Sequence, residues 1–159
     1  MRDYADLITW VVVADGEKAL VFRNADTDAA PLLQVVSEAE IENPPTREQG
    51  VSRAGRSRDH GGGGKQRSAL EETDWHRLEK VRFAKDFTAR LNNAALNDSF
   101  DRIAIFAPPH VLGEMRVAFH PELKKRIIAE SASDITRHSI EDIEDRVAKI
   151  LAPKPPPSV

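Results

Sequence analysis

Two short runs of β-branched and aromatic residues open the hydrophobic pattern of the chain. Residues 9–14 (TWVVVA) and 18–23 (KALVFR) flank Asp15-Gly16-Glu17, an arrangement typical of a β-hairpin. A third strand is predicted over residues 32–36. Residues 103–107 (IAIFA) form a continuous apolar run before two prolines, which is typical of a central strand covered on both faces. Residues 126–130 predict another strand, although this stretch also fits a helical turn.

A long helix is predicted after the third strand, from Thr73 or Asp74 to about Asn97. Its length would be roughly 35 Å at 1.5 Å per residue. Two tryptophans, Trp10 in the first strand and Trp75 at the start of this helix, are expected to pack in the core. The apolar stripe of the helix repeats at three- and four-residue spacing and comprises Leu78, Val81, Ala84, Phe87, Leu91 and Ala94 or Ala95.

Two shorter helices are predicted in the second half of the chain. One covers residues 111–119 and is closed by Pro121. The other begins at Ser139, with Asp142 three residues on as a weak form of the capping box. The acidic residues that crowd its first turns are explained by the helix dipole, which favours negative charge there, and not by a metal site.

The order of elements predicts an α/β fold of three layers, with a mixed sheet between helices and a hairpin at the amino-terminal end. A length of 159 residues and 40% hydrophobic composition suit one domain, which we place at residues 1–151. The proline-rich residues 152–159 are expected to form a disordered tail. Residues 45–70 are expected to form a long flexible loop between the third strand and the long helix.

This loop holds the most unusual composition in the chain. Residues 46–67 contain six of the eight glycines and one large apolar residue, Val51. Their six basic and two acidic residues sum to +4, so the remainder of a chain of net charge -3 carries -7. A basic, glycine-rich segment on an acidic body is typical of a segment that binds phosphate or RNA. The candidate RNA- or phosphate-binding residues are Arg47, Arg53, Arg56, Arg58, Gly63, Gly64, Lys65 and Arg67. A loop without a partner is the alternative.

Several enzyme signatures fail on inspection. The run ending at Gly64-Lys65 has Asp59 where a phosphate-binding loop needs its first glycine, and Gln66 where it needs Ser or Thr. Residues 50–54 lack the last glycine of a nucleophile elbow. The chain has no cysteine, and its five histidines show no metal-ligand spacing, so surface or capping roles are expected for them. We therefore expect no metal and no cofactor.

Nothing in the sequence predicts a membrane span or an export signal. The apolar run 7–14 is flanked by aspartates and is predicted to be a buried strand. No run approaches the roughly 18 apolar residues that a membrane span requires. We expect a cytoplasmic location and no membrane partner.

Several motifs resemble the bacterial host attachment protein family. They are residues 10–15 (WVVVAD) with 19–23, Phe100-Asp101 before IAIFAPP, residues 112–116 (LGEMR), and residues 134–138 (DITRH). The resemblance spans nearly the whole chain up to the last helix, and its most specific block is APPxxLGExR. The family-motif residues are Asp15, Pro108, Pro109, Leu112, Gly113, Arg116, Asp134, Thr136 and His138. In this block we expect Leu112 and Met115 to face the sheet, Gly113 to allow close approach, and Arg116 to bind carbonyls or an acidic partner.

That family is similar in turn to the middle domain of archaeal and eukaryotic class-one peptide-chain release factors. The resemblance implies a three-layer α/β/α fold. In those factors a Gly-Gly-Gln tip before a long helix enters the peptidyl-transferase centre. Here Lys65 interrupts the corresponding Gly63-Gly64-Lys65-Gln66, and the displacement of Gln66 argues against hydrolysis because catalysis there depends on close geometry.

The sequence thus predicts a non-enzymatic member of this family that associates with a ribosome or structured RNA through its basic loop. Two alternatives stay open. One is a peptidyl-tRNA hydrolase or ribosome-rescue factor that uses Gln66 as its catalytic residue, and the other is a protein–protein interaction module with a passive loop. Attachment to host cells is a phenotype, which a protein of this kind would influence indirectly.

Overall fold

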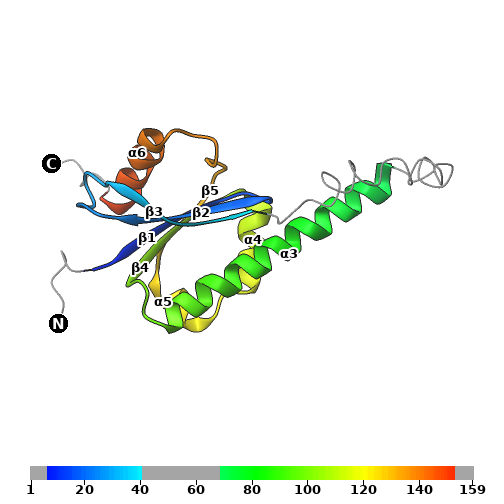
Figure 1. The fold of residues 1–159 in the computed structure, drawn as a ribbon, viewed down its shortest axis with the longest axis horizontal. Coiled ribbons are helices and arrows are strands. Elements are labelled where there is room, and N and C mark those ends of the chain that lie inside the picture. The colour runs from blue at the N-terminus through cyan, green and yellow to red at the C-terminus, as the bar shows by residue number, and fades with distance from the viewer. Residues whose placement is uncertain (1–6, 41–68, 153–159) are drawn as a thin grey trace, which may run out of the picture.

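The computed structural model describes residues 7–40 and 69–152, with side chains on the long helix described from residue 75 onward. A five-stranded mixed sheet lies at its centre, in the order β3-β2-β1-β4-β5 (Figure 1). The strands are β1 (Thr9–Ala14), β2 (Lys18–Asn24), β3 (Leu33–Glu40), β4 (Arg102–Ala107) and β5 (Ile127–Ala132). The predicted hairpin is confirmed, because β1 and β2 pair antiparallel across residues 15–17.

Helices cover both faces of the sheet, so the predicted three layers are confirmed (Figure 1). One face carries α3 (Ala69–Leu96), α4 (Pro109–Val117) and α5 (Pro121–Arg126), and the other carries α6 (Ile140–Leu151). Strand residues alternate between two cores. Val12 and Ile105 pack under α3 and α4, whereas Val11 and Phe106 pack under α6. Because β1 and β4 are buried on both faces, they read as continuous apolar runs.

Three neighbouring strands of the sheet, β1, β4 and β5, are parallel. β1 pairs parallel with β4, and β4 with β5, so their carboxyl ends lie at the same edge. After β1 the chain proceeds through β2 and β3 to one side, and from β4 it proceeds to β5 on the other side. From the carboxyl ends of β1 and β4 the chain therefore proceeds to opposite sides of the sheet.

Several boundaries differ from the sequence prediction. β3 extends to Glu40, and α3 begins at Ala69, which is four to five residues earlier than predicted and inside the predicted loop. Pro121 does not close the preceding helix but occupies the first turn of a helix that was not predicted, α5, where its missing N–H costs no hydrogen bond. His120 caps this helix, because its Nδ1 accepts a hydrogen bond from the amide of Glu122. The capping role expected for a histidine is confirmed here.

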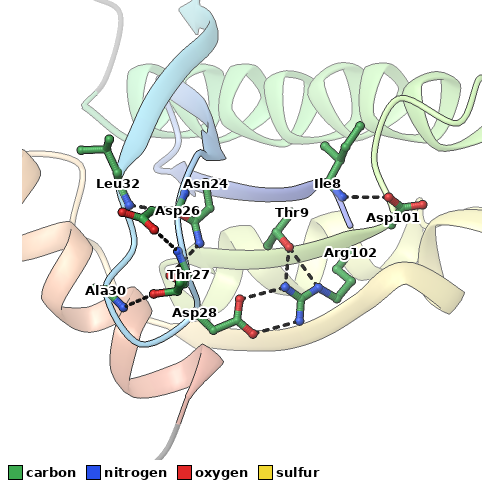
Figure 2. A network of polar contacts seen from close by, with 10 residues as sticks. All are labelled: Ile8, Thr9, Asn24, Asp26, Thr27, Asp28, Ala30, Leu32, Asp101 and Arg102. Carbon is green, nitrogen blue, oxygen red and sulfur yellow. Dashed lines mark hydrogen bonds and ion pairs between the residues drawn. The ribbon is translucent and has the colours of Figure 1, made fainter. Parts of the chain in front are cut away.

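A polar network fastens the amino ends of β1 and β4 (Figure 2). The guanidinium of Arg102 donates to both carboxylate oxygens of Asp28, at 2.9 and 3.1 Å, and to Oγ1 of Thr9, at 2.7 and 2.9 Å. Asn24 closes the β2–β3 connection by accepting from the amides of Asp26 and Leu32. The bidentate geometry and low exposure of the Arg102–Asp28 pair give this edge a structural role.

The carboxyl end of α3 is closed by a residue in the left-handed conformation. Asp98 has φ 57°, and the bonds from its amide to the carbonyl of Ala95 and from Ser99 to Ala94 form a Schellman motif. Arg126 of α5 reinforces this end, donating to Asp98 Oδ1 at 2.8 Å and to the carbonyl of Phe100 at 2.5 Å. The hydrogen bond to Asp98 raises the pKa of the Arg126 guanidinium.

Candidate functional site

The long helix α3 divides into a packed half and a projecting half (Figure 1). Among its side chains described from residue 75 onward, the buried ones are Ala84, Phe87, Thr88, Leu91 and Ala95, all in the carboxyl-terminal half. By contrast, residues 75–78 are exposed, and the helix extends past the sheet with its amino end farthest from it. At 28 residues, the helix is roughly 42 Å long.

Trp75 lies on the projecting half and is 48% exposed, so the expectation that it packs in the core is wrong. Leu78, the first residue of the predicted apolar stripe, is 61% exposed. Their helical spacing is correct, but the sheet ends before it reaches them. Trp10 does pack as expected, with its ring 4.7 Å from the ring of Phe100.

The predicted phosphate-binding residues lie outside the described residues. This holds for all eight, Arg47, Arg53, Arg56, Arg58, Gly63, Gly64, Lys65 and Arg67, and for Gln66. What the structure does place is the point where the basic segment joins the body. Arg67 precedes Ala69 by two residues, so the segment continues directly into the projecting end of α3.

The part of α3 whose side chains are described is basic over its first 16 residues, which span the projecting half and the start of the packed half. Between residues 75 and 90 the chain has five basic residues and two acidic ones, a net charge of +3. Arg82 and Lys85 are exposed on the side opposite the buried face. Glu79 and Asp86 are the acidic members. Residues 71–74, in the first turns of α3, include three acids, so the positive charge of the loop is separated from that of residues 75–90.

The projecting half leaves the body beside the β1–β2 turn. Gly16 in this turn is buried, and a Cβ placed on it would lie 2.7 Å from Cδ of Lys80. The aliphatic stem of Lys80 therefore lies across the backbone of Gly16. This contact places the Lys80 turn of α3 beside the carboxyl end of β1.

Three family-motif residues meet at that same edge. Thr136 Oγ1 lies 3.0 Å from Asp15 Oδ2 and 3.0 Å from Asp134 Oδ1. The other oxygen of Asp15 accepts from the amides of Glu17 and Lys18, at 2.7 and 2.8 Å. The cluster ties the β1–β2 turn to the β5–α6 connection, across 121 positions of sequence between Asp15 and Thr136. Since these groups bond to one another and to backbone amides, they hold the turn that Lys80 of α3 contacts.

The block APPxxLGExR forms the end of β4 and the helix α4. Pro108 and Pro109 start α4, and Leu112 and Met115 are buried against the sheet as predicted. The expected role of Gly113 is wrong, because a Cβ at this position would have no neighbour within 4 Å among the described residues.

Arg116 in the last turn of α4 finds the acidic partner that was expected. Its Nε lies 2.6 Å from Oε1 of Glu130 on β5, and the two side chains are 55% and 27% exposed. The pair joins a helix to an edge strand at the surface. Exposed pairs of this kind contribute at most about 1 kcal/mol to stability.

His138 borders a hollow between β5 and α6, next to the Thr136 cluster. The hollow has a volume of about 490 Å³. It exists because β5 presents only the small residues Ala129 and Ser131 on the side facing α6. Its polar lining is balanced in charge and consists of Ser131, His138, Asp142, Asp145, Arg146 and Lys149. Acids and bases four residues apart on α6 neutralise each other, so the hollow selects no obvious ligand charge.

Two kinds of site are not found in the described part of the chain. Over residues 7–40 and 69–152, no three His, Asp or Glu side chains are grouped so as to hold a metal ion. Over the same residues, no helix has the length and apolar character needed to cross a membrane.

Comparison with known proteins identifies the family. The family model described as bacterial archaeo-eukaryotic release factor family 12 matches residues 8–147. Among solved structures, the chain is similar to an archaeal translation termination factor, aRF1, with 13% identity and a TM-score of 0.44, over 87% of this chain and 37% of that one. No curated protein sequence matches. The expected link to attachment stays a prediction. Since the family model covers most of the sequence, the chain belongs to bacterial archaeo-eukaryotic release factor family 12.

Proposed function

We propose that this protein acts in translation, as an RNA- or ribosome-associated factor that makes contact through the basic segment 46–67. Membership of a release-factor family supports the translational role. The observation that carries the mode of contact is the projecting half of α3, because it joins the basic segment to the body at the point farthest from the sheet. In this proposal the projecting half carries one end of the basic segment away from the sheet.

The distribution of charge also supports contact through the basic segment. The segment carries +4 and the remainder of the chain -7, so phosphate is attracted to the segment and repelled by the body. Each basic side chain that contacts a phosphate releases counterions, and this gives affinity without sequence preference. The segment contains no aromatic residue, so its contacts would be with the nucleic-acid backbone.

The test is co-sedimentation with ribosomes by a variant in which Arg53, Arg56 and Arg58 are replaced by Gln. A matched control replaces three exposed cations of the body, Arg23, Lys124 and Arg137, and so changes the net charge equally. We expect the segment variant to lose binding and the control to keep it. If both variants sediment like the wild type, the segment is passive and a protein-interaction role is the better account.

Hydrolysis is a second function that one sequence feature favours, the glutamine that follows Gly63-Gly64-Lys65 before a long helix. Here the segment would be an RNA contact and also the carrier of Gln66 to a peptidyl-tRNA ester. Turnover of peptidyl-tRNA by the wild type, abolished in Gln66→Ala without loss of ribosome binding, would establish this. Equal background rates in both would leave a binding protein.

A further inference from the structure

The exposed face of α3 has a composition that the basic segment lacks. Trp75, Leu78, Arg82 and Lys85 are all exposed and follow at intervals of three or four residues, so they share one face of α3. The buried face of the same helix, with Ala84 and Phe87, points in the opposite direction. An aromatic ring and two cations therefore lie together on the side turned away from the body.

Core packing does not explain the indole of Trp75, because this side chain is exposed. Tryptophan contributes the largest apolar area of any side chain, and the other one in the chain is packed against Phe100. Single-stranded nucleic acids are held by aromatic side chains, on which bases stack, together with cations that contact the phosphates. Both are present on this face, as Trp75 and as Arg82 and Lys85.

We propose that Trp75 stacks on an unpaired RNA base while Arg82 and Lys85 contact the neighbouring phosphates, an inference that rests on the proposed function. Arg82 lies about 10 Å and Lys85 about 15 Å along the helix axis from Trp75. At about 3.4 Å per stacked nucleotide, this distance corresponds to roughly three to five nucleotides. The acidic residues Glu79 and Asp86 reduce the charge of the face, so stacking supplies the main part of the contact.

The experiment uses the fluorescence of Trp75. The chain has two tryptophans, so Trp10→Phe leaves Trp75 as the sole reporter. We expect saturable quenching when this variant is titrated with an oligouridine of about 12 nucleotides. Because Trp10 packs in the core, circular dichroism must show that the variant is folded. As a second measurement, the affinity for the same RNA is compared between the wild type and variants that keep Trp10. Trp75→Leu should weaken binding roughly 5- to 100-fold, and Trp75→Phe should weaken it by a smaller factor.

The control and the outcomes separate this inference from the function on which it rests. Val117→Ala, at a 78% exposed position on α4, should bind like the wild type. Unchanged fluorescence and wild-type affinity of Trp75→Leu, with binding lost in the Arg53, Arg56, Arg58 variant, would overturn the stacking site and leave the proposed function intact. Loss in Trp75→Leu but not in the segment variant would place RNA on the helix and overturn the segment. If the wild type binds no RNA, both fail.

Discussion

The two halves of α3 have the same backbone conformation and opposite surroundings. From Ala84 to Ala95 the helix buries one side against the sheet and is held by α4 and α5. From Trp75 to Leu78 it contacts little of the body, and its apolar side chains face solvent. A helix is thus continued well past the core that stabilises it.

This difference separates what holds the fold from what is available for function. Helical stability in proteins comes mainly from packing of an apolar face, and isolated helices of about 12–15 residues are marginal in water. The projecting half therefore depends on the packed half for its helical form. Side chains that contribute nothing to the core, such as Trp75 and Arg82, are free to be selected for binding.

The largest expected difference in stability is between leucine-to-alanine substitutions in the packed half and in the projecting half. Leu91→Ala removes a side chain that is 2% exposed and should lower the free energy of unfolding by about 2–5 kcal/mol. Leu78→Ala removes the same atoms from a 61% exposed position and should change it by less than about 0.5 kcal/mol. Urea unfolding followed by circular dichroism measures both. Equal losses would mean that the projecting half is packed in solution.

A smaller difference in stability is expected between alanine substitutions of two neighbouring asparagines. The side-chain amide of Asn92 donates to the carbonyl of Ala118 at 2.9 Å and accepts from the amide of His120 at 3.0 Å, which fastens the α4–α5 connection to the packed half. Asn92→Ala should cost about 1–3 kcal/mol because two partners lose their bonds. Asn93→Ala, one position along and exposed, is the control and should be nearly neutral. A neutral Asn92→Ala would show that water replaces both bonds.

The ion pair between α4 and β5 should contribute less to stability. Arg116→Ala breaks the surface pair with Glu130, and we expect a loss of no more than about 1 kcal/mol and a correspondingly small drop in melting temperature. Glu130→Gln should give a similar result, and the double variant should add nothing further. If stability is unchanged while ribosome binding disappears, Arg116 contacts the partner and its structural role is minor.

The smallest effect is a dependence on pH in α5, which packs against the packed half. The hydrogen bond and charge of Lys125 hold the pKa of Glu122 below its ordinary value of 4.5. A carboxyl with a lowered folded pKa stabilises the protein above the unfolded pKa, and this contribution is lost as pH falls through the lowered value. In an NMR titration, Lys125→Gln should therefore move the Glu122 pKa upward. No movement would show that the pair does not form in solution.

Local patterns predicted the sheet better than they predicted α3. The hairpin at residues 15–17 and the strand before Pro108 were recoverable because turn residues and continuous apolar runs are local signals. The helical period of α3 was equally clear, yet Trp75 was wrongly placed in the core, and Leu78 at the start of the apolar stripe is exposed. Periodicity identifies the apolar side of a helix but carries no information on where the opposing sheet ends.

The sequence identified the residues of the polar cluster at the β1–β2 turn one by one, but not the hydrogen bonds between them. Asp15, Asp134 and Thr136 were named from a family resemblance, but their hydrogen bonds join positions 121 apart, which no spacing rule predicts. The Arg102–Asp28 pair was missed altogether because single charges in a strand and a loop are unremarkable until the fold brings them together. For α5, Pro121 was taken as the end of one helix, although proline equally favours the first turn of the next.

The central claim is that the basic segment at the projecting end of α3 makes the RNA contact, and its salt dependence tests this most directly. We would measure the affinity for RNA at graded salt for the wild type, the Arg53, Arg56, Arg58 variant and the Arg23, Lys124, Arg137 control. The segment variant should lose up to three phosphate contacts, so its slope of log affinity against log salt should flatten by up to about 2–3 units, while the control keeps the wild-type slope. A segment variant with the affinity and slope of the wild type would contradict the account.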